Sequence, residues 1–220
     1  KRQLLMDLDT LNWMENVINR LDIPLVSLPS IKPSMFNYGT NEEILKNVPI
    51  TAVLGDQQAS LFGHNCISSG DVKNTYGTGC FALTNTGSEI VHSKNGLLST
   101  VAYQKDGDKP QYAIEGSVSI AGAAVQWLRD NLNIIQESSE VEALAMGEKD
   151  NGDVYFVPAF SGLFSPHWDE TARGVLVGLS RFSNKSHIAR AVLESVAYQS
   201  NELLESMQKD IGITLSLIHI

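Results

Sequence analysis

The sequence has few of the features that mark membrane, nucleic-acid-binding or disulfide-rich proteins. Its 220 residues include only two cysteines, Cys66 and Cys80, which make no disulfide framework and have no metal-binding spacing. No apolar run approaches the ~18 residues that span a membrane. Sixteen Lys and Arg residues against 25 Asp and Glu give a net charge of −9, which argues against a nucleic-acid partner. These absences predict a cytoplasmic globular protein with reduced thiols.

The chain also lacks signs of being complete. It begins at Lys1 without a methionine, and it ends in an apolar, strand-like run, "GITLSLIHI", that no turn follows. An unpaired apolar strand promotes aggregation, so we expect this run to pair with something in a longer parent protein. The sequence leaves open whether residues Ser216 to Ile220 are native.

Hydrophobic periodicity predicts an α/β protein with a mixed sheet, because strands come as hairpins and helices follow blocks of strands. A Pro-rich connector and a change of texture predict a domain boundary between Gly55 and Asp71. Strands are expected at 49–55, 72–76, 80–84, 98–103, 112–115 and 153–160, and the main helices at 57–63, 119–132 and 184–210.

Asp56 is the best-placed candidate for chemistry. It follows an apolar segment and precedes a short helix, the position at which α/β folds bind ligands. A carboxylate there can act as a base or orient a substrate hydroxyl, but Asp is also a preferred helix N-cap, and the sequence alone does not decide. Gln57 follows, and its amide can both donate to and accept from a polyol, or simply lie solvated in a first helical turn.

Two glycine-bearing segments are ambiguous in the same way. Gly77-Thr78-Gly79 separates two predicted strands, where glycine serves a tight turn or lets the backbone approach a phosphate. Gly122 and Gln126 lie one helical turn apart, and a glycine within a helix indicates close approach of another backbone or of a ligand. No GxxxxGK[ST] motif is present, which excludes a Walker-type phosphate loop within this chain.

Several linked segments together resemble the FGGY carbohydrate kinase family, and within it the members that phosphorylate glycerol. The resemblance covers nearly all of residues 1–213. It is carried by "GDQQASLFG" at 55–63, "NTYGTGCFALTNTG" at 74–87, "SKNGLLST" at 93–100, "EGSVSIAGAAVQWLRD" at 115–130, "VPAFSGLFSPHWDETARG" at 157–174 and "GVLVGLSRFSNKSHIARAVLE" at 174–194.

This resemblance implies an actin-like, ribonuclease-H-like ATPase fold, present here in part. Residues 1–63 would be the C-terminal part of the family's N-terminal domain, and residues 64–220 the first part of its C-terminal domain, with substrates meeting in an interdomain cleft. The implied reaction is phosphorylation of glycerol by ATP with Mg²⁺, in a parent protein that forms homo-oligomers. Missing regions leave room for association with a membrane or mitochondrial surface, and the fragment alone is expected to be inactive.

The resemblance also implies roles for individual residues. Asp56 matches the catalytic aspartate that contacts the polyol, Gln57 a glycerol ligand, and Phe81 an aromatic wall against the carbon chain. The nucleotide contacts matched are Thr78, Gly79, Gly122 and Gln126; no residue matches a metal ligand.

Three alternatives remain open at this point. One is another polyol or sugar kinase of the same family, and a second is an actin-like nucleotide switch whose output is domain rotation. The third is a non-catalytic interaction protein. The Asp56-Gln57 pair argues against the second, because a switch has little reason to carry polyol-binding groups.

Overall fold

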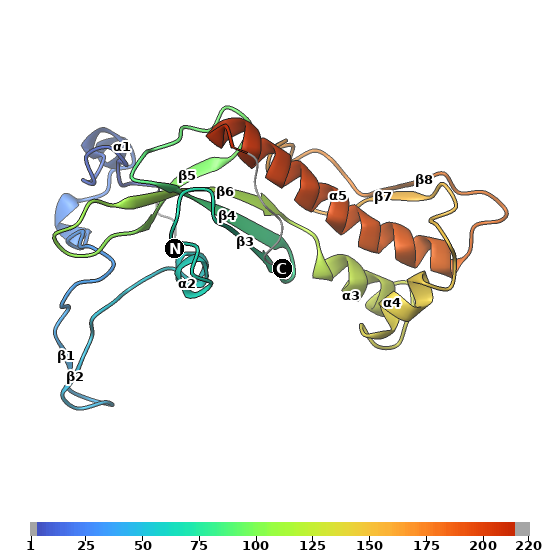
Figure 1. Ribbon diagram of the computed structural model, residues 1–220, viewed down its shortest axis with the longest axis horizontal. Coiled ribbons are helices and arrows are strands. Elements are labelled where there is room, and N and C mark those ends of the chain that lie inside the picture. Colours follow the sequence, from blue (N-terminus) through green and yellow to red (C-terminus); the bar gives the residue numbers. More distant parts are fainter. Residues whose placement is uncertain (1–3, 214–220) are drawn as a thin grey trace. The chain divides into compact units, whose positions relative to one another are not determined.

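The computed structural model describes residues 4–213, which form two compact units, each built from segments distant in sequence (Figure 1). The first unit comprises the chain up to Lys73 together with Thr84–His92 and Ser99–Ile114. The second comprises Asn74–Leu83, Ser93–Leu98 and the chain from Glu115 onward. The strand-like run predicted at the end of the chain lies, from residue 214, outside the described residues.

Helices and strands follow one another in blocks along the chain. The helices are α1 (Glu15–Arg20), η1 (Leu25–Ser27, 3₁₀), α2 (Asp56–Gly63), α3 (Gly122–Asp130), α4 (Glu140–Ala145) and α5 (Lys185–Ile211). The strands are β1 (Thr40–Asn41), β2 (Val48–Pro49), β3 (Val72–Tyr76), β4 (Cys80–Gly87), β5 (Leu98–Tyr103), β6 (Gln111–Val118), β7 (Tyr155–Val157) and β8 (Val175–Val177). No described helix has both the length and the apolar character needed to cross a bilayer.

The strands form one four-stranded sheet, in the order β3-β4-β6-β5, and two small antiparallel pairs, β1-β2 and β7-β8. Each strand of the larger sheet has residues in both units. The predicted α/β class is therefore confirmed.

In the first unit, α2 is held by its buried residue Leu61 and by Phe62, whose ring packs edge-on against Tyr103 at 5.2 Å. The loop after α2 is attached to β4, because the Asn85 side-chain amide donates to the carbonyl oxygen of Cys66 at 3.0 Å. Cys66 and Cys80 are both buried free thiols, as predicted. Burial raises the pKa of both, to about 11 for Cys80, which keeps them protonated at neutral pH.

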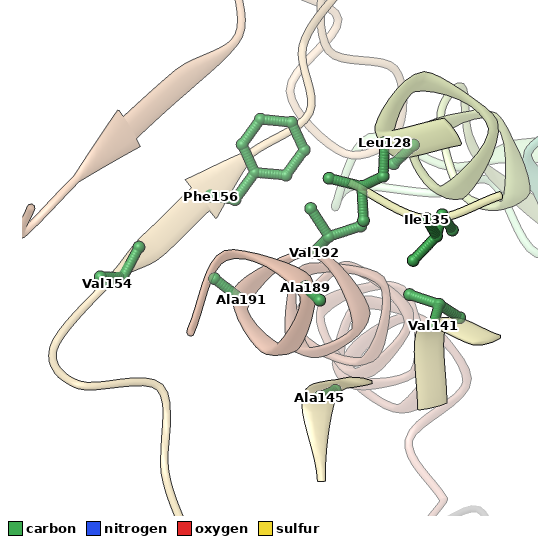
Figure 2. Close-up of a cluster of buried hydrophobic side chains, with 10 residues drawn as sticks. Leu128, Ile135, Val141, Ala145, Val154, Phe156, Ala189, Ala191 and Val192 are labelled. Atoms are coloured by element: carbon green, nitrogen blue, oxygen red, sulfur yellow. The ribbon is translucent and has the colours of Figure 1, made fainter. Parts of the chain in front are cut away.

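The core of the second unit gathers around α5. Figure 2 shows Leu128 of α3, Val141 of α4 and Phe156 of β7 lying beside Ala189 and Val192 of α5. Phe156 also stacks on Trp127, with ring centroids 5.4 Å apart. Figure 1 shows α5 between the β7-β8 pair and the short helices α3 and α4, so one long helix organises this core.

Two predicted elements differ from the structure. The apolar strand expected at 49–55 is wrong over most of its length, since only Pro49 pairs within a strand and Val53 is 56% exposed. Beyond Pro49 the segment is joined to residues 34–39 by separate backbone hydrogen bonds and by one bridge, between Met35 and Ala52, and these do not form a regular strand. The helix expected at 119–132 is shorter, starting at Gly122, because the preceding backbone bonds instead to the turn before β4.

Candidate active site

Asp56 is the first residue of α2, directly after the N-cap Gly55, whose backbone is extended. The N-cap interpretation of Asp56 is therefore wrong: another residue occupies the cap, and the Asp56 side chain is exposed. A carboxylate in the first turn of a helix is stabilised by the positive end of the helix dipole. The local structure thus presents an acid to solvent at the start of a helix.

A buried lysine lies beside this acid. Lys73 of β3 is only 6% exposed, and its ammonium donates a short hydrogen bond to Oε1 of Gln57. The other end of the same amide, Nε2 of Gln57, lies 3.4 Å from Oδ2 of Asp56. Lys73, Gln57 and Asp56 therefore form one polar cluster in the first unit.

The charge state of Lys73 follows from its burial. Loss of solvent lowers the pKa of the ammonium to about 8, and the negative charge of Asp56 opposes this shift. At neutral pH the lysine still carries its proton for most of the time. The sequence analysis missed this residue, because the burial of one lysine in "VKNTY" depends on what packs over the strand, and the letters alone carry no such signal.

The turn Gly77-Thr78-Gly79 joins β3 to β4 and contacts the start of α3. Gly77 accepts a hydrogen bond from the Gly122 amide at 2.9 Å, and Thr78 accepts from Ala121 and Ala123 at 2.8 and 3.1 Å. The first amides of α3 are thus satisfied by turn carbonyls. The structure brings the predicted residues Thr78, Gly79 and Gly122 together in the second unit.

Gly77, Gly79 and Gly122 differ in whether the structure leaves room for a side chain. A side chain at Gly79 would strike the carbonyl oxygen of Val118, and one at Gly122 would lie 2.6 Å from the Gly77 oxygen. Gly77 differs, because a Cβ there would have no neighbour closer than 3.7 Å. None of the three has a positive φ, so backbone conformation does not account for a glycine at any of them.

The remaining candidate residues lie at the surface. Thr78 and Gln126 are exposed, and Phe81 of β4 is 36% exposed although the strand residues around it are buried. An aromatic ring left partly in water on an otherwise buried strand can cover the apolar face of a small ligand. These positions are compatible with the roles implied by the resemblance, which stay predictions.

The chemistry of the side chains bears on whether Mg²⁺ has a dedicated site. Within residues 4–213, no three His, Cys, Asp or Glu side chains cluster closely enough to hold a metal ion. Mg²⁺ usually keeps several waters and binds through one or two carboxylates plus substrate phosphates. The described residues do not provide a protein cage for the ion, and we assign no ligand to it.

Comparison with known proteins identifies the family of this chain. A model of the FGGY family of carbohydrate kinases, C-terminal domain, matches residues 72–220. The chain is 57% identical over 216 residues to a glycerol kinase of Brucella anthropi, covering 98% of this chain and 43% of that protein. It is 52% identical over 221 residues to a glycerol kinase of Pseudarthrobacter chlorophenolicus, covering 100% of this chain and 44% of that protein.

Solved structures of carbohydrate kinases superpose on this chain. The crystal structure of Plasmodium falciparum glycerol kinase with ADP superposes with a TM-score of 0.88 at 41% identity, over 96% of this chain and 43% of that one. A xylulose kinase from Lactobacillus acidophilus superposes with a TM-score of 0.78 at 24% identity, over 94% of this chain and 44% of that one, which shows the fold alone. The prediction of an actin-like, ribonuclease-H-like fold that is present here in part is confirmed, and the chain spans less than half the length of these proteins. The chain belongs to the FGGY family of carbohydrate kinases.

Proposed function

We propose that this chain is the central part of an enzyme that transfers the γ-phosphoryl group of ATP to glycerol, giving glycerol 3-phosphate and ADP. The observation that carries the proposal is its 57% identity, over 98% of its length, to a protein named glycerol kinase. The exposed Asp56 carboxylate at the start of α2 supplies a residue suited to that chemistry.

Asp56 and Gln57 are proposed to hold the alcohol. A primary hydroxyl keeps its proton at neutral pH, so Asp56 accepts a hydrogen bond from it and takes the proton late, as the oxygen bonds to phosphorus. The bond between that phosphorus and the bridging oxygen of ADP breaks in the same transfer. Phe81 is proposed to cover the C–H face of the three-carbon chain.

The turn at 77–79 is proposed to approach the phosphates, with Thr78 and Gly79 as contacts and Gly122 and Gln126 of α3 as further nucleotide contacts. Gly77 supports this proposal, because neither backbone conformation nor packing requires a glycine there, and the bare position leaves room for an incoming anion. For Gly79 and Gly122 the close backbone contacts already explain the residue type.

Several further properties belong to the same proposal. Residues 1–63 are proposed to end the N-terminal domain and residues 64–220 to begin the C-terminal one, in a cytoplasmic homo-oligomer. Mg²⁺, when bound with the nucleotide, neutralises charge on the transferring group. The protein's own task is then to position two substrates, since phosphoryl transfer demands little covalent work from side chains.

Replacing Asp56 by Asn in the full-length protein tests the proposal. The amide keeps the shape but accepts a proton poorly, so we expect kcat to fall about 10²- to 10⁴-fold while the Kd of ATP stays nearly constant. The matched control is Asp106→Asn, at an exposed turn position, which we expect to leave kcat unchanged. Undiminished turnover in Asp56→Asn would remove this residue from the mechanism.

A panel of polyols and sugars tests the substrate. The related structures include kinases named for xylulose and gluconate, which share the fold at 24% identity. We expect kcat/KM for glycerol to exceed that for xylulose and gluconate by at least about 10²-fold. A preference for either sugar would assign the chain to another branch of the family, and ATP hydrolysis independent of any polyol would favour a nucleotide switch.

A further inference from the structure

We propose that Lys73 is a positioning residue that fixes the Gln57 side-chain amide in one orientation, so that Gln57 presents its NH₂ donors to the polyol. This inference rests on the proposed function, because it concerns how the same residues recognise the alcohol. It is carried by the buried contact between Lys73 and Gln57.

The orientation of the amide follows from the chemistry of lysine. A protonated lysine offers three donors and no acceptor, so the Gln57 atom that faces it must be the oxygen. The buried ammonium bonds Oε1 of Gln57 and thereby turns Nε2 toward Asp56, 3.4 Å from Oδ2. Without such a neighbour, a glutamine amide rotates through half a turn at little energetic cost and offers either group.

The consequence is a matched pair of groups at the start of α2. Asp56 is an acceptor, and Gln57 turns its NH₂ donors to the same side, because its oxygen faces Lys73. An alcohol is both donor and acceptor, so one hydroxyl, or two adjacent ones, can satisfy both residues at once. A free amide could instead compete with Asp56 for the hydroxyl proton and hold the substrate in an unproductive position.

Burial makes the arrangement rigid. Lys73 is 6% exposed, and the groups that face it include Asp56 and Gln57 from α2 and Cys66 from the following loop. A hydrogen bond to a buried charged group is stronger than one at the surface, and its loss leaves a polar group unsatisfied. Lys73 therefore acts through Gln57 and has no need to touch the substrate itself.

A double-mutant cycle in the full-length protein tests this inference, with the polyol that the wild type phosphorylates best. We expect Lys73→Met to raise the KM of the polyol about fivefold to tenfold and to change kcat less than about threefold. In a Gln57→Ala background the same substitution should raise KM less than about twofold, because the residue through which it acts is gone. The matched control is Lys109→Met, which removes an exposed lysine between β5 and β6 and should change neither kcat nor KM.

A second measurement does not depend on turnover. The Gln57 side-chain amide resonances, assigned by their absence in Gln57→Ala, should shift in Lys73→Met and stay in place in Lys109→Met. An equal KM effect of Lys73→Met with and without Gln57 would overturn the positioning role, as would unmoved amide resonances. A wild type that phosphorylates a polyol other than glycerol would instead overturn the proposed substrate and leave the cycle valid for that polyol.

Discussion

At the residue scale, Gly77 and Gly79 of the β3-β4 turn differ, because packing explains the glycine at 79 and does not explain the one at 77. Gly79 has to be small because Val118 approaches it, whereas a Cβ at Gly77 would meet only the Gly79 oxygen, at an ordinary contact distance of 3.7 Å. If the turn receives a phosphate, Gly77→Ala should lower kcat/KM for ATP about 10-fold or more, since a methyl group displaces the anion, while the melting temperature changes by less than about 2 °C. Steady-state kinetics and thermal unfolding of the full-length protein measure both quantities.

The matched variant is Gly79→Ala two positions away. We expect it to destabilise the protein by about 1–3 kcal/mol, because the added Cβ would overlap the β6 backbone. A fall in stability for Gly77→Ala as large as that for Gly79→Ala would mean that both glycines serve packing. Normal ATP kinetics in a stable Gly77→Ala protein would exclude the turn from phosphate binding.

At the element scale, the sequence predicted the elements that depend on local signals and failed for those that depend on tertiary contacts. The long helix was predicted within one residue at each end, because its signals are local: Asn184 caps it and Gly212 ends it with φ 75°. The strand at 49–55 failed because pairing depends on neighbours that the segment itself cannot specify. The site shows the same division, since Asp56 and Gln57 follow from position and motif, while Lys73 required knowledge of which residues bury it.

The cap of α5 gives a prediction at this scale. The Asn184 side chain accepts from the amides of Ser186 and His187 at 2.9 and 3.3 Å, and His187 Nδ1 accepts from the Asn184 amide at 3.1 Å. Because α5 organises the core of its unit, Asn184→Ala should lower stability by about 1–2 kcal/mol. Asn201→Ala, an exposed position in the middle of the same helix, should stay within about 0.5 kcal/mol. Chemical denaturation compares the two, and equal effects would show that the cap contributes nothing.

At the scale of the whole molecule, the β7-β8 pair exposes an apolar face, and the chain spans less than half the length of its relatives. β7 packs Phe156 on α5, yet its other side exposes Tyr155 and Val157, and the paired strand β8 exposes Val175 and Val177. The strand predicted at 153–160 is therefore shorter in the structure and buried on one face only. An apolar face on a two-stranded sheet is usually covered by another element, and the chain covers 43% of the Brucella anthropi relative.

We therefore predict different behaviour for residues 1–220 and for the full-length protein. The 220-residue chain should bind a hydrophobic dye and associate at micromolar concentration, and it should show no glycerol-dependent ATP consumption, whereas the full-length protein should bind little dye. Replacing Val175 and Val177 by Thr should reduce dye binding by the short chain, because it removes apolar area without disturbing the buried Phe156. Dye fluorescence, sedimentation and a coupled kinase assay make the comparison. A monomeric, dye-free or active 220-residue chain would show that this surface needs no cover and that the chain is sufficient by itself.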